Sequence, residues 1–201
     1  MAYNQTDGAT YTEGDVGHLS LGVGGGKYKA LQTDSVSGSL ISISYGHHEV
    51  HDGNAYWVSN NATLGNGEIN TVSLKTPNTT KWSHLLLQVD SSAEAVFDVL
   101  EDVTGIASGA ASVPMNFNRN TTNTSGNTCK VGDTTGADVI VPTGGTSIWL
   151  ETLGVKGIVT SRVNDSELIL KQNSQYLFRV TNGATANNCT ILLIWYEHTS
   201  L

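Results

Sequence analysis

The densest group of side chains that could do chemistry lies at residues 47–52, where three imidazoles and two carboxylates occur within six positions. Imidazole nitrogens and carboxylate oxygens are common ligands of zinc and other transition metals. We interpret the segment as a strand end, which places His47, Glu49 and His51 on one face and His48 on the other. A fourth ligand would have to come from elsewhere, so we expect a polar strand end and no stoichiometric metal.

Two further patterns fall short of a catalytic or cofactor site. The glycine-rich stretch Gly22–Lys27 differs from a phosphate-binding loop, because Tyr28 follows the lysine and Leu21 stands where the first glycine belongs. No G-x-S-x-G nucleophile motif occurs, and the carboxylates of Glu101 and Asp102 are adjacent, so in a strand they point to opposite faces. We therefore expect a protein that is not an enzyme and that uses no cofactor.

Two adjacent aromatic pairs, Tyr56–Trp57 and Trp195–Tyr196, are the other notable feature. One ring of each pair could face the core and the other face outward, where it could anchor an interface or a sugar. We favour the alternative, in which both rings of a pair are buried between stacked sheets. The two cysteines, Cys129 and Cys189, have no metal-ligand spacing, and we expect reduced thiols, although a bridge between them stays open.

The composition sets limits on the class of protein. Glycine, serine, threonine and asparagine make up 82 of 201 residues, and only 14% of residues are charged, which indicates short strands joined by turns. The net charge is −8, and no lysine or arginine occurs between Trp82 and Asn118, so we expect no nucleic-acid partner. The longest apolar run, Ile191–Tyr196, is too short to span a bilayer, and we expect neither a membrane segment nor a signal peptide.

Alternating apolar and polar residues predict an all-β fold, a β-sandwich or jelly roll. The expected strands are at residues 40–45, 55–58, 69–74, 82–89, 95–100, 113–117, 139–141, 147–153, 167–170, 176–181 and 190–197. No window shows a sustained helical pattern of apolar residues. The segment 118–135 is dense in Asn and Thr and is predicted to be a long exposed loop.

The first 35 residues differ from the rest of the chain. Residues 1–35 are rich in glycine and poor in apolar side chains, so they cannot build a core of their own, whereas residues 36–201 carry the strand pattern. We predict an extended N-terminal arm that a neighbouring subunit or the chain's own domain holds in place. Its candidate partner-binding side chains are Tyr3, Tyr11, His18 and Tyr28.

Several segments, taken in order, resemble a known family. They are His51–Ser59, Asn116–Asn120, Glu167–Asn182 and Trp195–His198. From about residue 47 to the end, the chain resembles the capsid decoration, or cement, proteins of tailed bacteriophages. These have a β-sandwich or jelly-roll body and brace the capsid lattice against the pressure of packaged DNA.

The resemblance implies a structural protein of the virion. It implies binding to the major capsid protein on the outer capsid surface, after assembly in the host cytoplasm, as a homo-oligomer with a trimer favoured over a dimer. Arg119 would then be a candidate inter-subunit contact. Two alternatives stay open: a receptor-binding or lectin-like module of a phage tail or head fibre, and a cupin-like enzyme using His47, Glu49 and His51.

Overall fold

The computed structural model describes residues 20–23, 27–30, 45–106, 108–134, 140–154, 158–160 and 167–199, and the chain divides into units of residues 1–44 and 45–201. In the first unit, β1 (Ser20–Val23) and β2 (Lys27–Ala30) pair as two antiparallel strands. The rest of the predicted arm, including Tyr3, Tyr11 and His18, lies outside the described residues, as does the strand expected from residue 40 to 44. Tyr28 lies in β2, where only its backbone is described.

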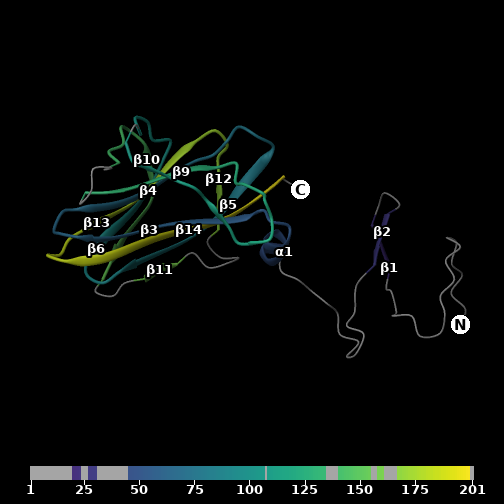
Figure 1. The fold of residues 1–201 in the computed structure, drawn as a ribbon, viewed down its shortest axis with the longest axis horizontal. Coiled ribbons are helices and arrows are strands. Elements are labelled where there is room, and N and C mark those ends of the chain that lie inside the picture. The colour runs from purple at the N-terminus through teal and green to yellow at the C-terminus, as the bar shows by residue number, and fades with distance from the viewer. Residues whose placement is uncertain are drawn as a thin grey trace, which may run out of the picture. The chain divides into compact units, whose positions relative to one another are not determined.

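The second unit is an all-β sandwich of two antiparallel sheets with one short helix, α1 (Tyr45–His51) (Figure 1). One sheet, here called the β13 sheet, has the strand order β10-β6-β13-β4-β9-β7. The other, the β14 sheet, has the order β11-β5-β14-β3-β8, and β12 also pairs with β5. The strands are β3 (Ala55–Leu64), β4 (Ile69–Lys75), β5 (Lys81–Ser91), β6 (Ala95–Glu101), β7 (Ala110–Ser112), β8 (Met115–Asn116), β9 (Thr128–Asp133), β10 (Thr146–Leu153), β11 (Ile158–Thr160), β12 (Leu168–Leu170), β13 (Gln175–Asn182) and β14 (Asn187–Thr199).

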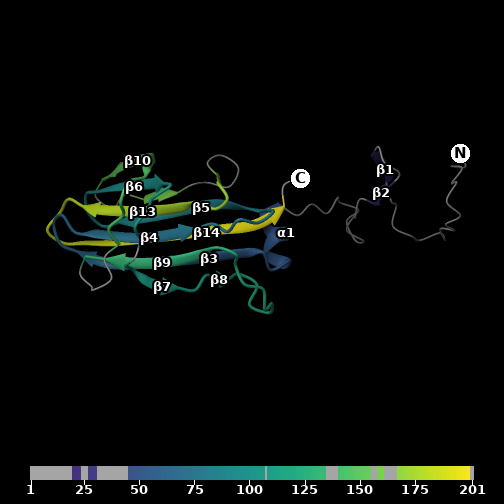
Figure 2. The same ribbon diagram turned by 90° about the horizontal axis from the view of Figure 1, so that it is seen from above.

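The core lies between the two sheets because the long strands alternate strictly. Every second residue of β5 and β14 is buried, and the residues between them are at least partly exposed. The largest buried side chains include Trp195 and Tyr176, together with Phe97 and Phe178. Each fully buried apolar side chain contributes about 1.5–3 kcal/mol. In Figure 2 the long strands of both sheets run in similar directions, as in an aligned sandwich.

The sequence pattern located most of these strands. The expected strands at 55–58, 69–74, 82–89, 95–100, 147–153, 167–170, 176–181 and 190–197 are confirmed as β3, β4, β5, β6, β10, β12, β13 and β14. The strand expected at 113–117 is reduced to β8 at residues 115–116. Among the described residues, no helix is long or apolar enough to cross a membrane.

The prediction of a loop throughout 118–135 is wrong at its end. Residues Thr128–Asp133 form β9, which pairs with β4 on one side and β7 on the other. Cys129 is the residue of this strand whose side chain is buried in the main core. Its polar residues are tolerated because they meet polar neighbours; the Thr71 hydroxyl, for example, donates to the Gly132 carbonyl at 2.7 Å.

The strand expected at 139–141 is also wrong for its described part. Ile140 is fully buried in a loop, where it packs with Val103 and Leu177. Leu177 belongs to β13, but its side chain points away from the main core and joins this second, smaller cluster. Loops therefore cover part of the outer face of the β13 sheet.

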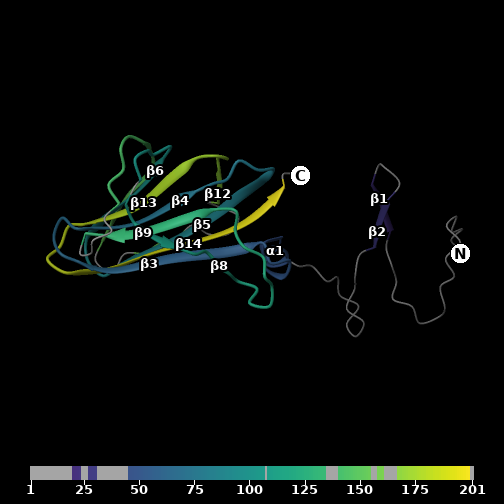
Figure 3. The ribbon, with the colours of Figure 1, turned by 45° about the horizontal axis from the view of Figure 1, so that its top comes forward.

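Helix α1 replaces the predicted strand end at residues 47–52. Gly53 lies two residues after the end of the helix, and its φ of 73° is the left-handed conformation that favours glycine. The Gly53 amide donates to the Val50 carbonyl at 3.1 Å, and the Asn54 amide donates to the Glu49 carbonyl at 2.9 Å. This pair of hydrogen bonds is a Schellman cap, so Asp52 and Gly53 terminate a helix and not a strand. Figure 3 shows α1 where β3 begins.

Candidate functional site

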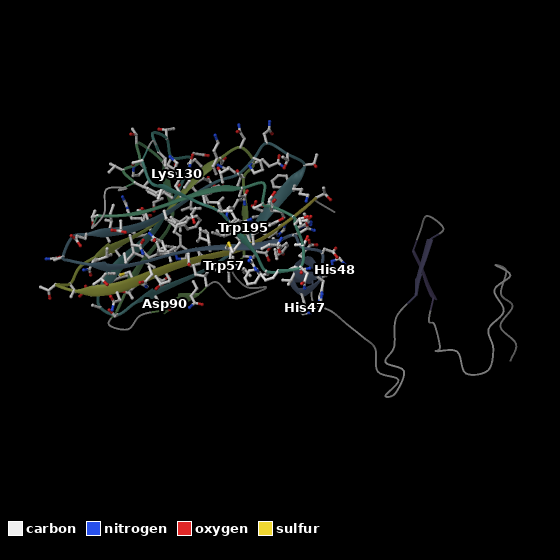
Figure 4. The ribbon with its side chains drawn as sticks, in the orientation of Figure 1. His47, His48, Trp57, Asp90, Lys130 and Trp195 are labelled. Atoms are coloured by element: carbon white, nitrogen blue, oxygen red, sulfur yellow. The ribbon has the colours of Figure 1, made fainter. Side chains whose placement is uncertain are left out.

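The metal-site candidate at residues 47–52 has a different geometry from the expected one, because residues 45–51 form a helix. Residues four apart share a helix face, so His47 and His51 lie together on the surface, with their Nε2 atoms 2.9 Å apart. Glu49 turns inward, is buried, and accepts a hydrogen bond from Asn54 Nδ2 at 3.0 Å. The expected facing set of His47, Glu49 and His51 is therefore wrong, because it assumed strand geometry. Figure 4 places His47 and His48 on α1.

Within the part of the chain that the structure describes, no group of three or more His, Cys, Asp or Glu side chains is arranged so that all of them could hold one metal ion.

The Asn-rich segment after β8 is fixed against the end of α1. Asn116 Nδ2 donates to the Gly53 carbonyl at 2.8 Å, and Asn118 Nδ2 donates to the His51 carbonyl at 2.9 Å. Arg119 follows directly and is exposed. These amides are engaged in holding the loop, and the guanidinium of Arg119 is presented at the surface.

The two cysteines are free thiols buried in opposite sheets, which confirms the expected reduced state. Burial, and then the charge of Glu197, raise the pKa of Cys129 to about 12. Burial also raises the pKa of Cys189, against the opposing effect of a hydrogen bond with Ser91. Because the thiolate is the reactive form, neither cysteine is suited to nucleophilic chemistry.

The buried carboxylate of Glu197, near the end of β14, holds several neighbouring groups by hydrogen bonds. It accepts hydrogen bonds from Trp195 Nε1 at 3.0 Å, from the Gly126 amide at 3.0 Å and from the Ser125 hydroxyl. Burial, and then this charge, raise the pKa of Tyr56 to about 12. The contacts tie the loop before β9 to β14, so Glu197 has a positioning role in the fold.

The outer face of the β14 sheet carries a row of apolar side chains across four neighbouring strands. Ile194 of β14 is paired with Leu86 of β5 on one side and Trp57 of β3 on the other, and Trp57 is paired with Met115 of β8. The first three are partly exposed and Met115 is 37% exposed. We call these four residues the apolar row. In Figure 4, Trp57 and the buried Trp195 lie on neighbouring strands of this sheet.

The aromatic pairs are therefore split between core and surface. Tyr56 and Trp195 are buried, whereas Trp57 and Tyr196 are partly exposed on the outer face. The favoured prediction, burial of both rings, is wrong, because the outer face of this sheet has no second sheet stacked on it among the described residues.

Next to the apolar row lies a cluster of His84, Tyr196, His198 and Glu167, here called the imidazole cluster. The rings of His84 and Tyr196 stack with centroids 4.8 Å apart, and those of His84 and His198 are 4.3 Å apart. Glu167 accepts hydrogen bonds from the Tyr196 hydroxyl at 2.8 Å and from His84 Nδ1. No local motif could have revealed this cluster, because His84 and His198 are 114 positions apart and only strand pairing joins them.

Comparisons with protein-family models, with curated proteins and with solved structures find no match to this chain. The fold itself defines the class, an all-β antiparallel sandwich with an N-terminal extension that contains a hairpin.

Proposed function

We propose that the chain is a capsid decoration protein of a tailed bacteriophage, which binds the outer surface of the capsid as a homo-oligomer and stabilises the lattice of the major capsid protein. The observation that supports this proposal is the apolar row. Contiguous apolar surface on a folded domain marks sites of protein contact, and tryptophan and methionine are enriched in the buried centres of interfaces. The resemblance of the segments between residues 47 and 198 supports the choice of partner.

The position of the row suits adhesion to a flat protein surface. Its four side chains come from four adjacent strands, whose main chains pair with one another, so the surface is rigid before binding. A rigid surface loses little conformational entropy on association. The net charge of −8 fits a protein on the outside of a capsid, away from the packaged DNA.

The lectin-like alternative draws less support from the same structure. Sugar-binding loops present amide and carboxylate groups to the ligand, but Asn116 and Asn118 direct their amide groups to backbone carbonyls at the end of α1. The groups that would recognise a glycan there hold the loop in place instead. We therefore rank adhesion to protein above glycan binding.

The experiment is co-sedimentation of the full chain with expanded, DNA-free capsids of the phage that encodes it. Wild type should saturate the capsids, and Trp57→Ala should bind about 30-fold more weakly, since losing a central aromatic contact costs roughly 2 kcal/mol. Leu150→Ala is the matched control, because Leu150 is 68% exposed on β10 of the other sheet. It should bind as wild type does.

The result that would refute the proposal is equal binding by Trp57→Ala and wild type, or no wild-type binding to capsids. Far-UV circular dichroism and a thermal melt of each variant separate loss of the interface from loss of the fold.

A further inference from the structure

Two imidazoles of the imidazole cluster face each other through the same ring nitrogen. His84 Nε2 and His198 Nε2 are 2.6 Å apart, on the neighbouring strands β5 and β14. Main-chain pairing of the two strands holds the rings in this position, and the ring of Tyr196 stacks on that of His84. The arrangement is thus a built feature of the sheet surface.

The contacts of the other ring nitrogens fix which nitrogen carries the proton when each ring is neutral. His84 Nδ1 is bonded to the carboxylate of Glu167, and His198 Nδ1 is 2.7 Å from the backbone carbonyl of Thr199. A carboxylate and a carbonyl only accept hydrogen bonds, so each Nδ1 must carry a proton. In a neutral imidazole the remaining nitrogen then has a lone pair. Two neutral rings would therefore point lone pairs at each other, so the close contact needs a cation between the two Nε2 atoms, either a proton shared in a hydrogen bond or a metal ion.

We propose that His84 and His198 form a binding site for a divalent late transition metal, with zinc as its simplest occupant. Neutral imidazole nitrogen is a preferred ligand of zinc, copper and nickel. Metal-ligating histidines commonly donate their second N–H to a carboxylate or a backbone carbonyl, which is the pattern at these two rings. This proposal differs from the sequence-based expectation, which considered only the histidines of α1, and it does not depend on the proposed function.

The two nitrogens are closer together than a bound metal requires. Bonds of about 2.05 Å from zinc to each nitrogen, at the tetrahedral angle of about 109°, place the nitrogens about 3.3 Å apart. The two rings, whose Nε2 atoms are 2.6 Å apart, would have to separate by about 0.7 Å to reach that distance. Solvent completes the coordination shell, and any proton shared by the rings is released when the metal binds. Glu167 acts as a positioning residue that holds the ring of His84.

The second pair of facing imidazoles must be removed before the test. His47 and His51 also have their Nε2 atoms 2.9 Å apart, on the exposed surface of α1. The parent protein for the experiment is therefore the full chain with His47→Ala and His51→Ala. Zinc chloride is titrated into the metal-free parent by calorimetry, and zinc is counted by elemental analysis after dialysis.

The parent should bind one zinc per chain, and adding His198→Ala should remove that zinc. Adding Glu167→Gln should weaken zinc binding about tenfold or more, as expected for loss of a ligand's supporting carboxylate. Zinc should raise the melting temperature of the parent and leave that of the His198→Ala variant unchanged. His198 is the second-last residue of β14 and is not part of the core, so its replacement should change stability little. A thermal melt of the variant without zinc checks that it is folded.

Three results would overturn the proposal. The first is no zinc uptake by the parent at a tenfold excess of metal. The second is equal uptake by the parent and the His198→Ala variant. The third is an ¹⁵N NMR spectrum that shows one ring protonated on both nitrogens and that does not change when zinc is added. That result would show that a proton, and not a metal, lies between the two Nε2 atoms.

Discussion

Replacing Glu197 by glutamine tests the reasoning about the buried end of the sandwich. One carboxylate oxygen of Glu197 accepts from Trp195 Nε1 and the Ser125 hydroxyl, and the other accepts from the Gly126 amide. Glutamine keeps one acceptor oxygen but puts an NH₂ group in place of the other. That group cannot accept a hydrogen bond, so at least one buried N–H or O–H loses its partner.

The expected loss follows from the cost of an unsatisfied buried donor, about 1–3 kcal/mol. Glu197→Gln should therefore lower the free energy of unfolding by about 1–3 kcal/mol, and Glu197→Ala should lower it further. The midpoint of thermal unfolding should fall by about 2–4 °C for each kcal/mol. Urea denaturation monitored by tryptophan fluorescence is the assay, with Glu94→Gln as the control, because Glu94 is exposed.

The control should change stability by less than about 0.5 kcal/mol. If Glu197→Gln is as stable as wild type, the carboxylate does not hold the loop before β9, and the account of this end of the fold is wrong. The variant also removes one cause of the raised Tyr56 pKa, so an absorbance titration of the phenol should show that pKa fall while it stays above 10, since burial is the larger cause.

Two further predictions concern titration and reactivity. Cys129 and Cys189 should resist a thiol-specific disulfide reagent at pH 8 in the native protein and should both react in guanidinium, because burial raises their pKa values; rapid modification of both in the native state would contradict this. Stability should fall as pH rises from about 10 towards 12, because the folded pKa values of Tyr56 and Tyr176 are raised above that of a free phenol, so the unfolded chain loses those protons first. Urea midpoints measured across this pH range check the sign, and a midpoint that increases would be inconsistent with the buried phenols.

The sequence predicts strands well where one face of a strand is buried. In β5 and β14 the alternation of apolar and polar side chains follows the pleat, so the pattern and the burial agree. In β9 the pattern fails, because Cys129 and Val131 are its only apolar side chains and the neighbouring β4 supplies polar contacts. The fold of residues 45–51 was missed because a seven-residue helix is too short to show a period.

The candidate surfaces depend on strand pairing, which the sequence does not display. The apolar row takes one residue from each of four strands, and its members become neighbours only through the register of β14 with β3 and β5 and of β3 with β8. The same register joins His84 to His198. By contrast, the helical pair His47 and His51 is local, and a correct assignment of α1 would have placed them together.

The number of copies of this chain in purified bacteriophage virions tests the proposal of a capsid decoration protein most directly. Quantitative mass spectrometry against the major capsid protein gives the ratio. A decoration protein that covers the capsid lattice should be present at close to one copy for each major capsid subunit. A dozen or fewer copies for each virion would favour a tail or vertex role and contradict the account, as would absence of the chain from the particle.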